Sequence, residues 1–326
     1  MLPSPLNIKI TGFGLYLPPK IETSAEFAPK IGKTERWINT RTGVLEKRIS
    51  EIDVDEMGAI ASKQAIGDRD IPDLIINASA VGKQAIPDTS VFIQKQLGFE
   101  GVPSFTIHAT CLSFLVAFHT AANYIHNNVY KRILVVSTDR GIRGRNINEA
   151  ESAALLGDGA AAVMLGTNTE NDNSQLLYWK MHTWPSGAEF TELRGGGTHL
   201  PPHEPKMKME DNLFTMKGPK VYKLAREKVS AMVSKMLETC NITHDDIDWI
   251  IPHQASGMAV RAYVKYGGFD ECKVVNVVSK TGNCVAASLP MALVMQYQKK
   301  PFKRGDKILM IGTGAGLSAA ATLFTY

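Results

Sequence analysis

The feature that most constrains the fold is an internal repeat. KRILVVST at 131–138 is answered by DKILMIGT at 306–313, and the small-residue stretch GDGAAAVMLG that follows the first copy is answered by GAGLSAAATLF. Two copies are too few for a solenoid, so we expect a duplicated α/β unit whose halves pack as one body. We place the halves at residues 1–172 and 173–326.

Strand-like and helix-like segments alternate along the chain, which is typical of an α/β protein. Short apolar runs predict buried strands and longer amphipathic or apolar runs predict helices. The predicted strands are 8–17, 74–80, 104–107, 132–137, 157–165, 176–182, 248–252, 274–278, 307–313 and 319–326. The predicted helices are 51–66, 88–97, 112–127, 217–237, 254–266 and 286–298. The Gly-, Pro- and His-rich segment 184–209 predicts a long surface loop.

Composition excludes several classes of protein. The 326 residues are 44% hydrophobic and 21% charged, with a net charge of +4, which favours an ordinary globular protein. No block of Lys and Arg indicates nucleic-acid binding, although the mild positive charge suits an acidic partner. The chain has neither a secretory signal pattern nor an apolar run long enough for a membrane span, so we expect a cytoplasmic protein.

Cys111 is the strongest candidate nucleophile. It follows the short strand 104–107 and opens the apolar helix 112–127, so its sulfur is expected at a helix N-terminus. Unpaired main-chain N–H groups and the helix dipole favour an anion there, which predicts a stabilised thiolate. The alternative is a buried structural cysteine, the more common role of an isolated cysteine.

Two more polar residues follow predicted strands of the second half. His253 ends the strand 248–252, and Asn283 lies in the loop phrase KTGNCVAAS. Side chains at the carboxyl ends of strands in α/β sheets commonly form active sites. His253 could act as an acid or base or as a hydrogen-bond donor, and Asn283 could donate a hydrogen bond to a thioester carbonyl. The alternatives are a structural histidine and an ordinary turn asparagine.

The glycine-rich segments at 157–159 and 312–316 do not match a dinucleotide-binding loop, because strand rather than helix follows them. We interpret them as positions of close main-chain approach, either at a packed seam or around a ligand. The chain has no HExxH motif and no Cys/His cluster, so no metal site is predicted.

Taken together, these phrases resemble the β-ketoacyl-acyl-carrier-protein synthase III family over nearly the whole chain. The matching phrases are ERWINTRTGVLEKRI at 35–49, HATCLSF at 108–114, LLGDGAAAVML at 155–165, DWIIPHQA at 248–255 and GNCVAAS at 282–288. The resemblance implies a thiolase-like five-layered αβαβα fold with two duplicated halves. It also implies a homodimer without a tightly bound cofactor, acting on coenzyme A or acyl-carrier-protein thioesters.

By this resemblance Cys111 accepts an acyl group, and His253 and Asn283 stabilise the enolate formed when a malonyl-type thioester loses carbon dioxide. The enolate then attacks the acyl group in a decarboxylative Claisen condensation, and the amides of Cys111 and Ala315 form the oxyanion hole. Two alternatives remain. The chain could transfer the acyl group to a hydroxyl or amine, or it could be an inactive subunit of a heterodimer.

The same resemblance implies substrate contacts, with departures. Trp37 and Arg41 match positions that bind the nucleotide end of coenzyme A, and Met216 and Tyr222 match positions lining the pantetheine tunnel. Ser256 replaces a supporting Asn, and Ile86 replaces an aromatic residue that closes the acyl pocket across the dimer. Further departures are Ala150, Pro219, the Gly257-Met258 pair and a loop after Trp184 that is longer than usual. We therefore expect a divergent member with an altered donor or acceptor, suited to secondary metabolism.

Overall fold

Two sheets form the frame of the molecule. The computed structural model describes residues 4–168 and 172–326, and in this part of the chain each large sheet has five strands. The first sheet has the order β2-β8-β7-β5-β6, and the second has the order β1-β9-β14-β13-β12. The strands of the first sheet are β2 (Lys9–Tyr16), β5 (Leu74–Asn77), β6 (Ser104–Thr106), β7 (Arg132–Arg140) and β8 (Asp158–Gly166). Those of the second are β1 (Leu6–Asn7), β9 (Gln175–Thr183), β12 (Trp249–Pro252), β13 (Lys307–Gly314) and β14 (Ser318–Thr325).

The two sheets repeat the same connections. In the first, β2, β8 and β7 are antiparallel neighbours and β5 is parallel to β7. In the second, β9, β14 and β13 are antiparallel neighbours and β12 is parallel to β13. The repeated segments form β7 and β13, each followed by a strand of small residues, so the predicted duplication is confirmed. The boundary at residues 172 and 173 stays a prediction, and it adjoins residues 169–171, which lie outside the described chain.

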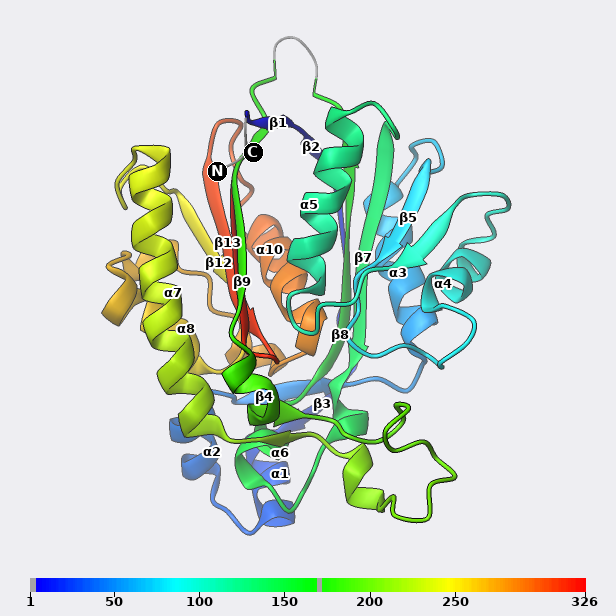
Figure 1. The fold of residues 1–326 in the computed structure, drawn as a ribbon, viewed down its shortest axis with the longest axis vertical. Coiled ribbons are helices and arrows are strands. Elements are labelled where there is room, and N and C mark those ends of the chain that lie inside the picture. The colour runs from blue at the N-terminus through cyan, green and yellow to red at the C-terminus, as the bar shows by residue number, and fades with distance from the viewer. Residues whose placement is uncertain (1–3, 169–171) are drawn as a thin grey trace.

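Helices α5 (Ser113–His126) and α10 (Ser288–Lys299) lie between the sheets (Figure 1). Their apolar side chains share one buried cluster with strands of both sheets, including Phe114, Phe118, Leu289, Ile133 and Ile308. This cluster joins the two halves, because burial of apolar surface is the main favourable contribution to folding.

The outer faces of the sheets are covered by further helices. Helices α3 (Val54–Ile66) and α4 (Thr89–Leu97) pack on the first sheet, while α7 (Gly218–Cys240) and α8 (Gly257–Gly267) pack on the second (Figure 1). The order of layers is therefore helix, sheet, helix, sheet, helix. The predicted five-layered αβαβα fold is confirmed.

Smaller elements gather at one end of the molecule, at the bottom of Figure 1. They are β3 (Lys20–Thr23), β4 (Glu46–Ile49), α1 (Ser24–Phe27), α2 (Glu35–Thr42) and α6 (Ala150–Leu155). The predicted loop at 184–209 runs beside them and is mostly irregular. It begins with the 3₁₀ helix Pro185–Phe190 and the short strand β10 (Thr191–Glu192), which pairs with β11 (Thr215–Met216).

The predicted strand at 274–278 is wrong. Only Val274 forms a bridge, to Ile250, and helix α9 (Val278–Thr281) begins at the end of the predicted span. The side chain of Gln254 takes the place of a neighbouring strand. Its Oε1 accepts hydrogen bonds from the N–H groups of Val277 (2.9 Å) and Val278 (3.1 Å), and its Nε2 donates to the carbonyl of Val275 (3.1 Å).

Helices α3 and α8 begin three residues later than predicted, each at a capping side chain. Asp53 precedes α3 and forms a reciprocal capping box with Glu56, so this helix starts at Val54 rather than at residue 51. Ser256 accepts a hydrogen bond from the N–H of Ala259 (3.1 Å), so α8 starts at Gly257 rather than at residue 254. Such caps satisfy N–H groups that the first helical turn leaves without partners.

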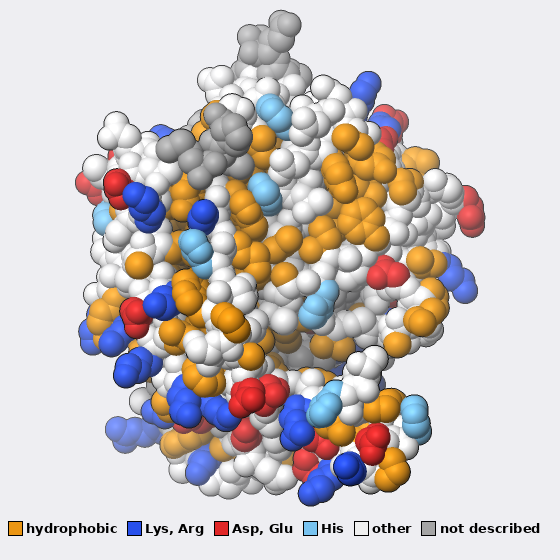
Figure 2. Space-filling view, viewed as in Figure 1, with side chains coloured by type: hydrophobic (Ala, Val, Ile, Leu, Met, Phe, Trp, Pro, Cys, Tyr) orange, Lys and Arg blue, Asp and Glu red, His pale blue; other side chains and the backbone are white. Residues whose placement is uncertain are grey.

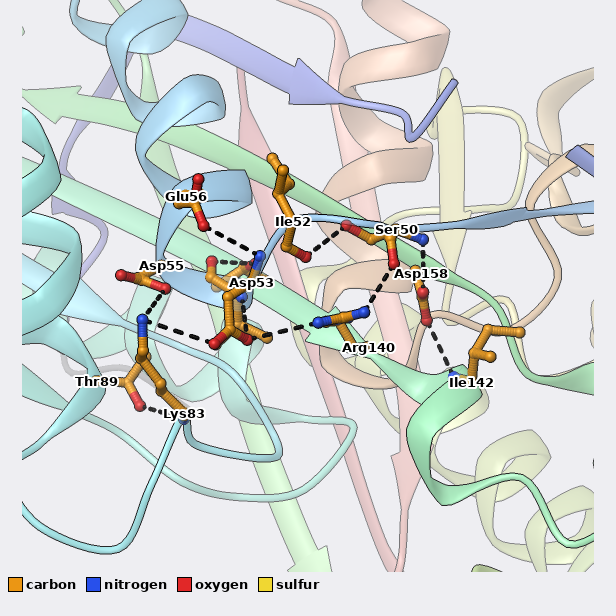
Figure 3. A network of polar contacts seen from close by, with 12 residues as sticks. Ser50, Ile52, Asp53, Asp55, Glu56, Lys83, Thr89, Arg140, Ile142 and Asp158 are labelled. Carbon is orange, nitrogen blue, oxygen red and sulfur yellow. Dashed lines mark hydrogen bonds and ion pairs between the residues drawn. The ribbon is translucent and has the colours of Figure 1, made fainter. Parts of the chain in front are cut away.

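The GDG segment at 157–159 is a packed seam, which was one of the two roles predicted for it. A Cβ atom on Gly157 would lie 2.2 Å from the carbonyl oxygen of Thr281, so only glycine fits. The buried carboxylate of Asp158 accepts hydrogen bonds from the N–H groups of Ser50 (2.8 Å) and Ile142 (3.0 Å). Arg140 extends this network to the carbonyl of Ser50 and to Asp53 (Figure 3).

Asp158→Asn is expected to lower the free energy of unfolding by about 1–3 kcal/mol, because one amide oxygen cannot accept both buried N–H donors. Urea denaturation followed by circular dichroism measures the change. Asp70→Asn is the matched control, since Asp70 is 83% exposed in its pair with Arg132 and should change stability by less than about 1 kcal/mol. Equal effects of the two substitutions would contradict this role for Asp158.

Candidate active site

Cys111 lies in a tight turn at the start of α5, as predicted. Thr110 has a φ of 53°, which bends the chain sharply just before the cysteine. Ser113 fastens the turn, because its hydroxyl donates to the carbonyl of Thr110 (2.7 Å) and accepts from the N–H of Ala109 (2.9 Å). Leu112 caps the helix, so Cys111 immediately precedes the cap. The cysteine therefore lies at the helix N-terminus without belonging to the helix.

The predicted resting thiolate is wrong. Burial raises the pKa of the Cys111 thiol to about 12, and the nearby carboxylate of Asp139 raises it further, while hydrogen bonding from the amides of Cys111 and Ala315 opposes both. For the thiolate, the free energy lost when water is removed exceeds the stabilisation that a helix N-terminus provides. The resting sulfur is a neutral thiol at neutral pH. The same amides of Cys111 and Ala315 are those predicted to form the oxyanion hole.

Asp139, at the carboxyl end of β7, joins the nucleophile side of the site to the Asn283 side. Its Oδ1 accepts hydrogen bonds from the N–H groups of Ala80 (3.0 Å) and Val81 (3.2 Å), and its Oδ2 accepts one from Ala287 (3.2 Å). Burial raises the pKa of this carboxyl to about 7, and the N–H donors oppose the rise. This one carboxyl group therefore fixes the position of the loop after β5 relative to the segment after Asn283.

His253 follows β12, as predicted, and its side chain is buried. Its main-chain N–H donates to the carbonyl of Ile311 (2.9 Å), which fixes the residue against β13. Among the described residues, none forms a hydrogen bond with its Nδ1. Burial lowers the pKa of the imidazole to about 4, so His253 is neutral at physiological pH. A neutral imidazole donates a proton through one nitrogen and accepts through the other.

Asn283 is held with its amide in a defined orientation. Its Oδ1 accepts hydrogen bonds from the N–H of Val285 (2.9 Å) and the hydroxyl of Ser288 (3.2 Å). Its Nδ2 donates only a long contact to the carbonyl of Ala255 (3.4 Å), two residues after His253. The carboxamide nitrogen therefore retains a proton that it can donate to a ligand.

The end of β13 brings these parts together. A Cβ on Gly312 would lie 2.7 Å from the Cβ of His253 and 3.4 Å from Leu112, and a Cβ on Gly314 would lie 2.6 Å from the Oγ1 of Thr110. The strand end is thus in contact with His253 on one side and with the nucleophile turn on the other. Glycine at these positions permits that approach.

A tunnel leads from the surface toward Asn283. Its lining runs from Arg41 and Glu151 at the outer end to Asn283 and Thr313 at the inner end, and includes Phe214, Met216, Pro219, Tyr222, Ser256 and Met258. An outer pocket with Trp37, Arg36 and Arg261 shares Arg41 and Met258 with the tunnel. A third, mostly apolar cavity between α7 and α8 shares Tyr222 and Thr313 with it and is lined by His253. Cys111 lines none of these three cavities. The turn that carries Cys111 instead contacts the end of β13, through Thr110 and Gly314.

The predicted substrate-binding residues fall into two groups. Arg41, Met216, Tyr222 and Ser256 line the tunnel, and Trp37 lines its outer pocket. Ile86 lies apart from them, in the loop between β5 and α4, and is 84% exposed. A role for Ile86 across a dimer stays a prediction.

Sequence reasoning missed four polar residues around the site: Asp139, Gln254, Glu151 and Ser288. Gln254 and Ser288 stand inside the phrases PHQAS and GNCVAAS, so adjacency to His253 and Asn283 was the available signal. Asp139 and Glu151 had no comparable signal, because their partners are distant in sequence.

Comparison with known proteins adds to this geometry. The family model of 3-oxoacyl-[acyl-carrier-protein] synthase III matches residues 105–185, and the model of its C-terminal part matches residues 237–326. The β-ketoacyl-[acyl-carrier-protein] synthase III of Rickettsia bellii is 32% identical over 329 residues, which cover 98% of this chain and 100% of that protein. The protein of the same name from Geobacillus kaustophilus is 32% identical over 319 residues, or 96% of each chain. The chain belongs to the 3-oxoacyl-[acyl-carrier-protein] synthase III family.

Solved structures agree with this membership. The crystal structure of 3-oxoacyl-[acyl-carrier-protein] synthase III from Aquifex aeolicus matches with a TM-score of 0.88 at 30% identity, covering 98% of this chain and 100% of that one. The priming β-ketosynthase of the R1128 polyketide pathway matches with a TM-score of 0.87 at 26% identity, covering 100% and 98%. The resemblance predicted from the sequence phrases is confirmed, and so is the thiolase-like fold. The synthase III relatives are acyl-transferring enzymes.

No group of three or more His, Cys, Asp or Glu side chains in residues 4–168 and 172–326 could hold a metal ion. No helix within these ranges has both the length and the apolar character needed to cross a bilayer.

Alkylation of Cys111 by iodoacetamide is expected to accelerate about tenfold per pH unit from pH 7 to 9 without a plateau, because only the thiolate reacts and its pKa lies far above this range. Peptide mass spectrometry of timed samples measures the rate. The urea-unfolded chain is the control, since an ordinary cysteine pKa near 8.5 makes its rate level off. A plateau below pH 8 in the folded protein would show that the thiolate is stabilised after all.

Proposed function

We propose that this synthase III family member catalyses a decarboxylative Claisen condensation at Cys111 and produces a β-ketoacyl thioester. The observation that carries the proposal is a pair of neutral hydrogen-bond donors where two cavities meet: Asn283 lines the inner end of the tunnel, and His253 lines the cavity between α7 and α8 that shares Tyr222 and Thr313 with it. His253 is an imidazole whose Nδ1 has no bonding partner among the described residues. The Oδ1 of Asn283 accepts two hydrogen bonds, while its Nδ2 makes only a long contact to the carbonyl of Ala255. Plain acyl transfer has no need of such a pair, and stabilisation of an enolate does.

In the first half-reaction the sulfur of Cys111 attacks the carbonyl of an acyl thioester. A new carbon–sulfur bond forms, the bond to the donor thiol breaks, and the proton of Cys111 leaves with the departing thiol. Because the thiol pKa is about 12, we propose that proton loss accompanies the attack. Amides of Cys111 and Ala315 would donate to the carbonyl oxygen as it becomes negative.

In the second half-reaction a malonyl-type thioester occupies the tunnel. Its carboxylate leaves as carbon dioxide, and the bonding electrons pass into an enolate whose oxygen accepts hydrogen bonds from His253 and Asn283. The enolate carbon attacks the carbonyl of acyl-Cys111, the carbon–sulfur bond breaks, and the sulfur takes up a proton. Neutral donors suit this step, because burial lowers the pKa of His253 to about 4 and keeps it uncharged.

Acyl-coenzyme A or acyl carrier protein would supply the thioesters, and no tightly bound cofactor takes part. We propose that the product enters fatty acid or secondary metabolite biosynthesis in the cytoplasm. The polyketide-priming relative supports the second of these routes.

We also propose that the chain forms a homodimer through β6, the edge strand of the first sheet. Its residues 104–106 are partly exposed, and its pairing partner in the described chain is β5 alone. The carbonyl of Pro103 and the N–H of Ile107 bond to β5, so the main-chain groups of Ser104 and Thr106 point outward. An open edge of this kind pairs readily with another strand.

Asn283→Asp is the sharpest test of the condensation. The carboxylate preserves an acceptor for Val285 and Ser288 but replaces the donor with a negative charge, which repels the enolate. We expect carbon dioxide release from malonyl thioester to fall roughly 100-fold or more, while acylation of Cys111 persists. Radiolabelled carbon dioxide and intact mass measure the two steps.

Cys111→Ala is the companion variant, and it should abolish the acyl-enzyme. Acyl-enzyme formation by wild-type protein without carbon dioxide release, but with transfer to an added alcohol or amine, would replace the proposed reaction by simple acyl transfer. Unchanged turnover of Cys111→Ala would exclude both reactions.

Ser104→Pro is expected to weaken the dimer, because proline removes an outward N–H from β6 without removing a bond to β5. Light scattering should give twice the chain mass of 35.6 kDa for the wild type and a lower average mass for the variant at the same concentration. Ser104→Ala is the control and should remain dimeric. A monomeric wild-type protein at micromolar concentration would contradict the proposal.

A further inference from the structure

The outer end of the tunnel contains an ion pair that the sequence did not predict. The Nε and Nη2 of Arg41, on α2, both lie 2.7 Å from the Oε1 of Glu151, on α6. Both side chains remain partly exposed, at 50% and 40%, so the pair lies where the tunnel opens to solvent. Arg41 and Glu151 are the charged residues in the tunnel lining of the described chain.

The second oxygen of Glu151 faces another positively polarised group. A Cβ added to Gly218 would lie 3.2 Å from Oε2, so the carboxylate lies against the first residue of α7. The first turn of this 23-residue helix has no acidic residue of its own and no side-chain cap. A helix N-terminus attracts anions through its free N–H groups and its dipole. The carboxylate of Glu151 thus pairs with Arg41 and lies at the N-terminus of α7. These are two groups at the tunnel mouth that would otherwise attract a phosphate.

We infer that Glu151 tunes donor specificity by lowering the affinity for coenzyme A thioesters relative to thioesters that carry fewer phosphate charges. This inference rests on the proposed function, and it assigns the substrate class of the same site. A coenzyme A donor brings a pyrophosphate and a further phosphate to the tunnel mouth, whereas a carrier-bound arm brings a single phosphodiester. Repulsion from a fixed carboxylate grows with the number of these charges.

The surroundings of the mouth define the competing possibility. Arg36 and Arg261 line the outer pocket beside Trp37, and neither forms an ion pair within the described residues. Figure 2 shows charged side chains of both signs gathered over this end of the molecule. If these arginines dominated the binding of the coenzyme A phosphates, removal of the Glu151 charge would change its affinity little.

The test compares acyl-coenzyme A with the same acyl group on uncharged pantetheine. The readout is the ratio of kcat/KM values for Cys111 acylation by the two donors, measured by intact mass. Glu151→Gln should raise this ratio about fivefold in favour of coenzyme A at low ionic strength, and the gain should shrink at high salt because screening weakens the repulsion. Isothermal titration with coenzyme A alone should show a matching gain in affinity.

Two further variants separate charge from shape. Glu35→Gln, on the exposed start of α2, removes the same charge outside the tunnel and should leave the ratio unchanged. Glu151→Asp keeps the charge and should preserve the preference against coenzyme A. A Glu151→Gln protein that melts like the wild type yet gives the wild-type ratio and the wild-type coenzyme A affinity would overturn the inference.

The failure of this inference and of the proposed function are distinguishable. Acylation by both donors with a ratio independent of Glu151 would sink the specificity role alone. If neither donor acylated Cys111, the proposed function would fail and the inference would fail with it.

Discussion

The site depends on one buried carboxyl group that is bonded to main-chain N–H groups from both halves of the chain. Asp139 holds the loop after β5 through Ala80 and Val81, and it holds the segment after Asn283 through Ala287. Cys111 belongs to the first of these halves, and His253 and Asn283 belong to the second. Their relative position therefore depends on a cross-link that no local sequence pattern encodes. Loss of a buried acceptor leaves its donors unpaired, which is why such contacts are expensive to break.

Burial determines the protonation states of the site more strongly than the helix dipole does. Cys111 has a pKa near 12 and His253 a pKa near 4, so both are uncharged at rest. A neutral thiol and a neutral imidazole cost less to bury than their charged forms, and the neutral imidazole remains a hydrogen-bond donor for a developing enolate. The same dry surroundings strengthen each hydrogen bond made to that charge. Selectivity is then left to the outer end of the tunnel, where Arg41 and Glu151 meet solvent.

Close main-chain contacts make this arrangement possible. Gly312 and Gly314 allow the end of β13 to touch His253 and the nucleophile turn, and Gly157 allows the seam against Thr281. Glycine-rich phrases that could suggest a nucleotide site are used here for packing. Strand β13 and its repeat counterpart β7 each contribute their carboxyl end to the site. Gly312 and Gly314 lie at the end of β13, and Asp139 lies near the end of β7.

The family resemblance placed Arg41, Met216 and Tyr222 around the tunnel, and the sequence by itself determined the duplicated α/β architecture and the places of Cys111, His253 and Asn283 at the ends of elements. These follow from local periodicity and from phrases whose residues are neighbours in the chain. Prediction from the sequence was wrong where a side chain met groups distant in the chain. The side chain of Gln254 replaces the strand expected at 274–278, and the cap formed by Ser256 makes α8 start later than expected. Burial and the carboxylate of Asp139 keep Cys111 protonated. Tertiary structure decided these points, because hydrogen bonding and loss of water depend on which groups meet in space.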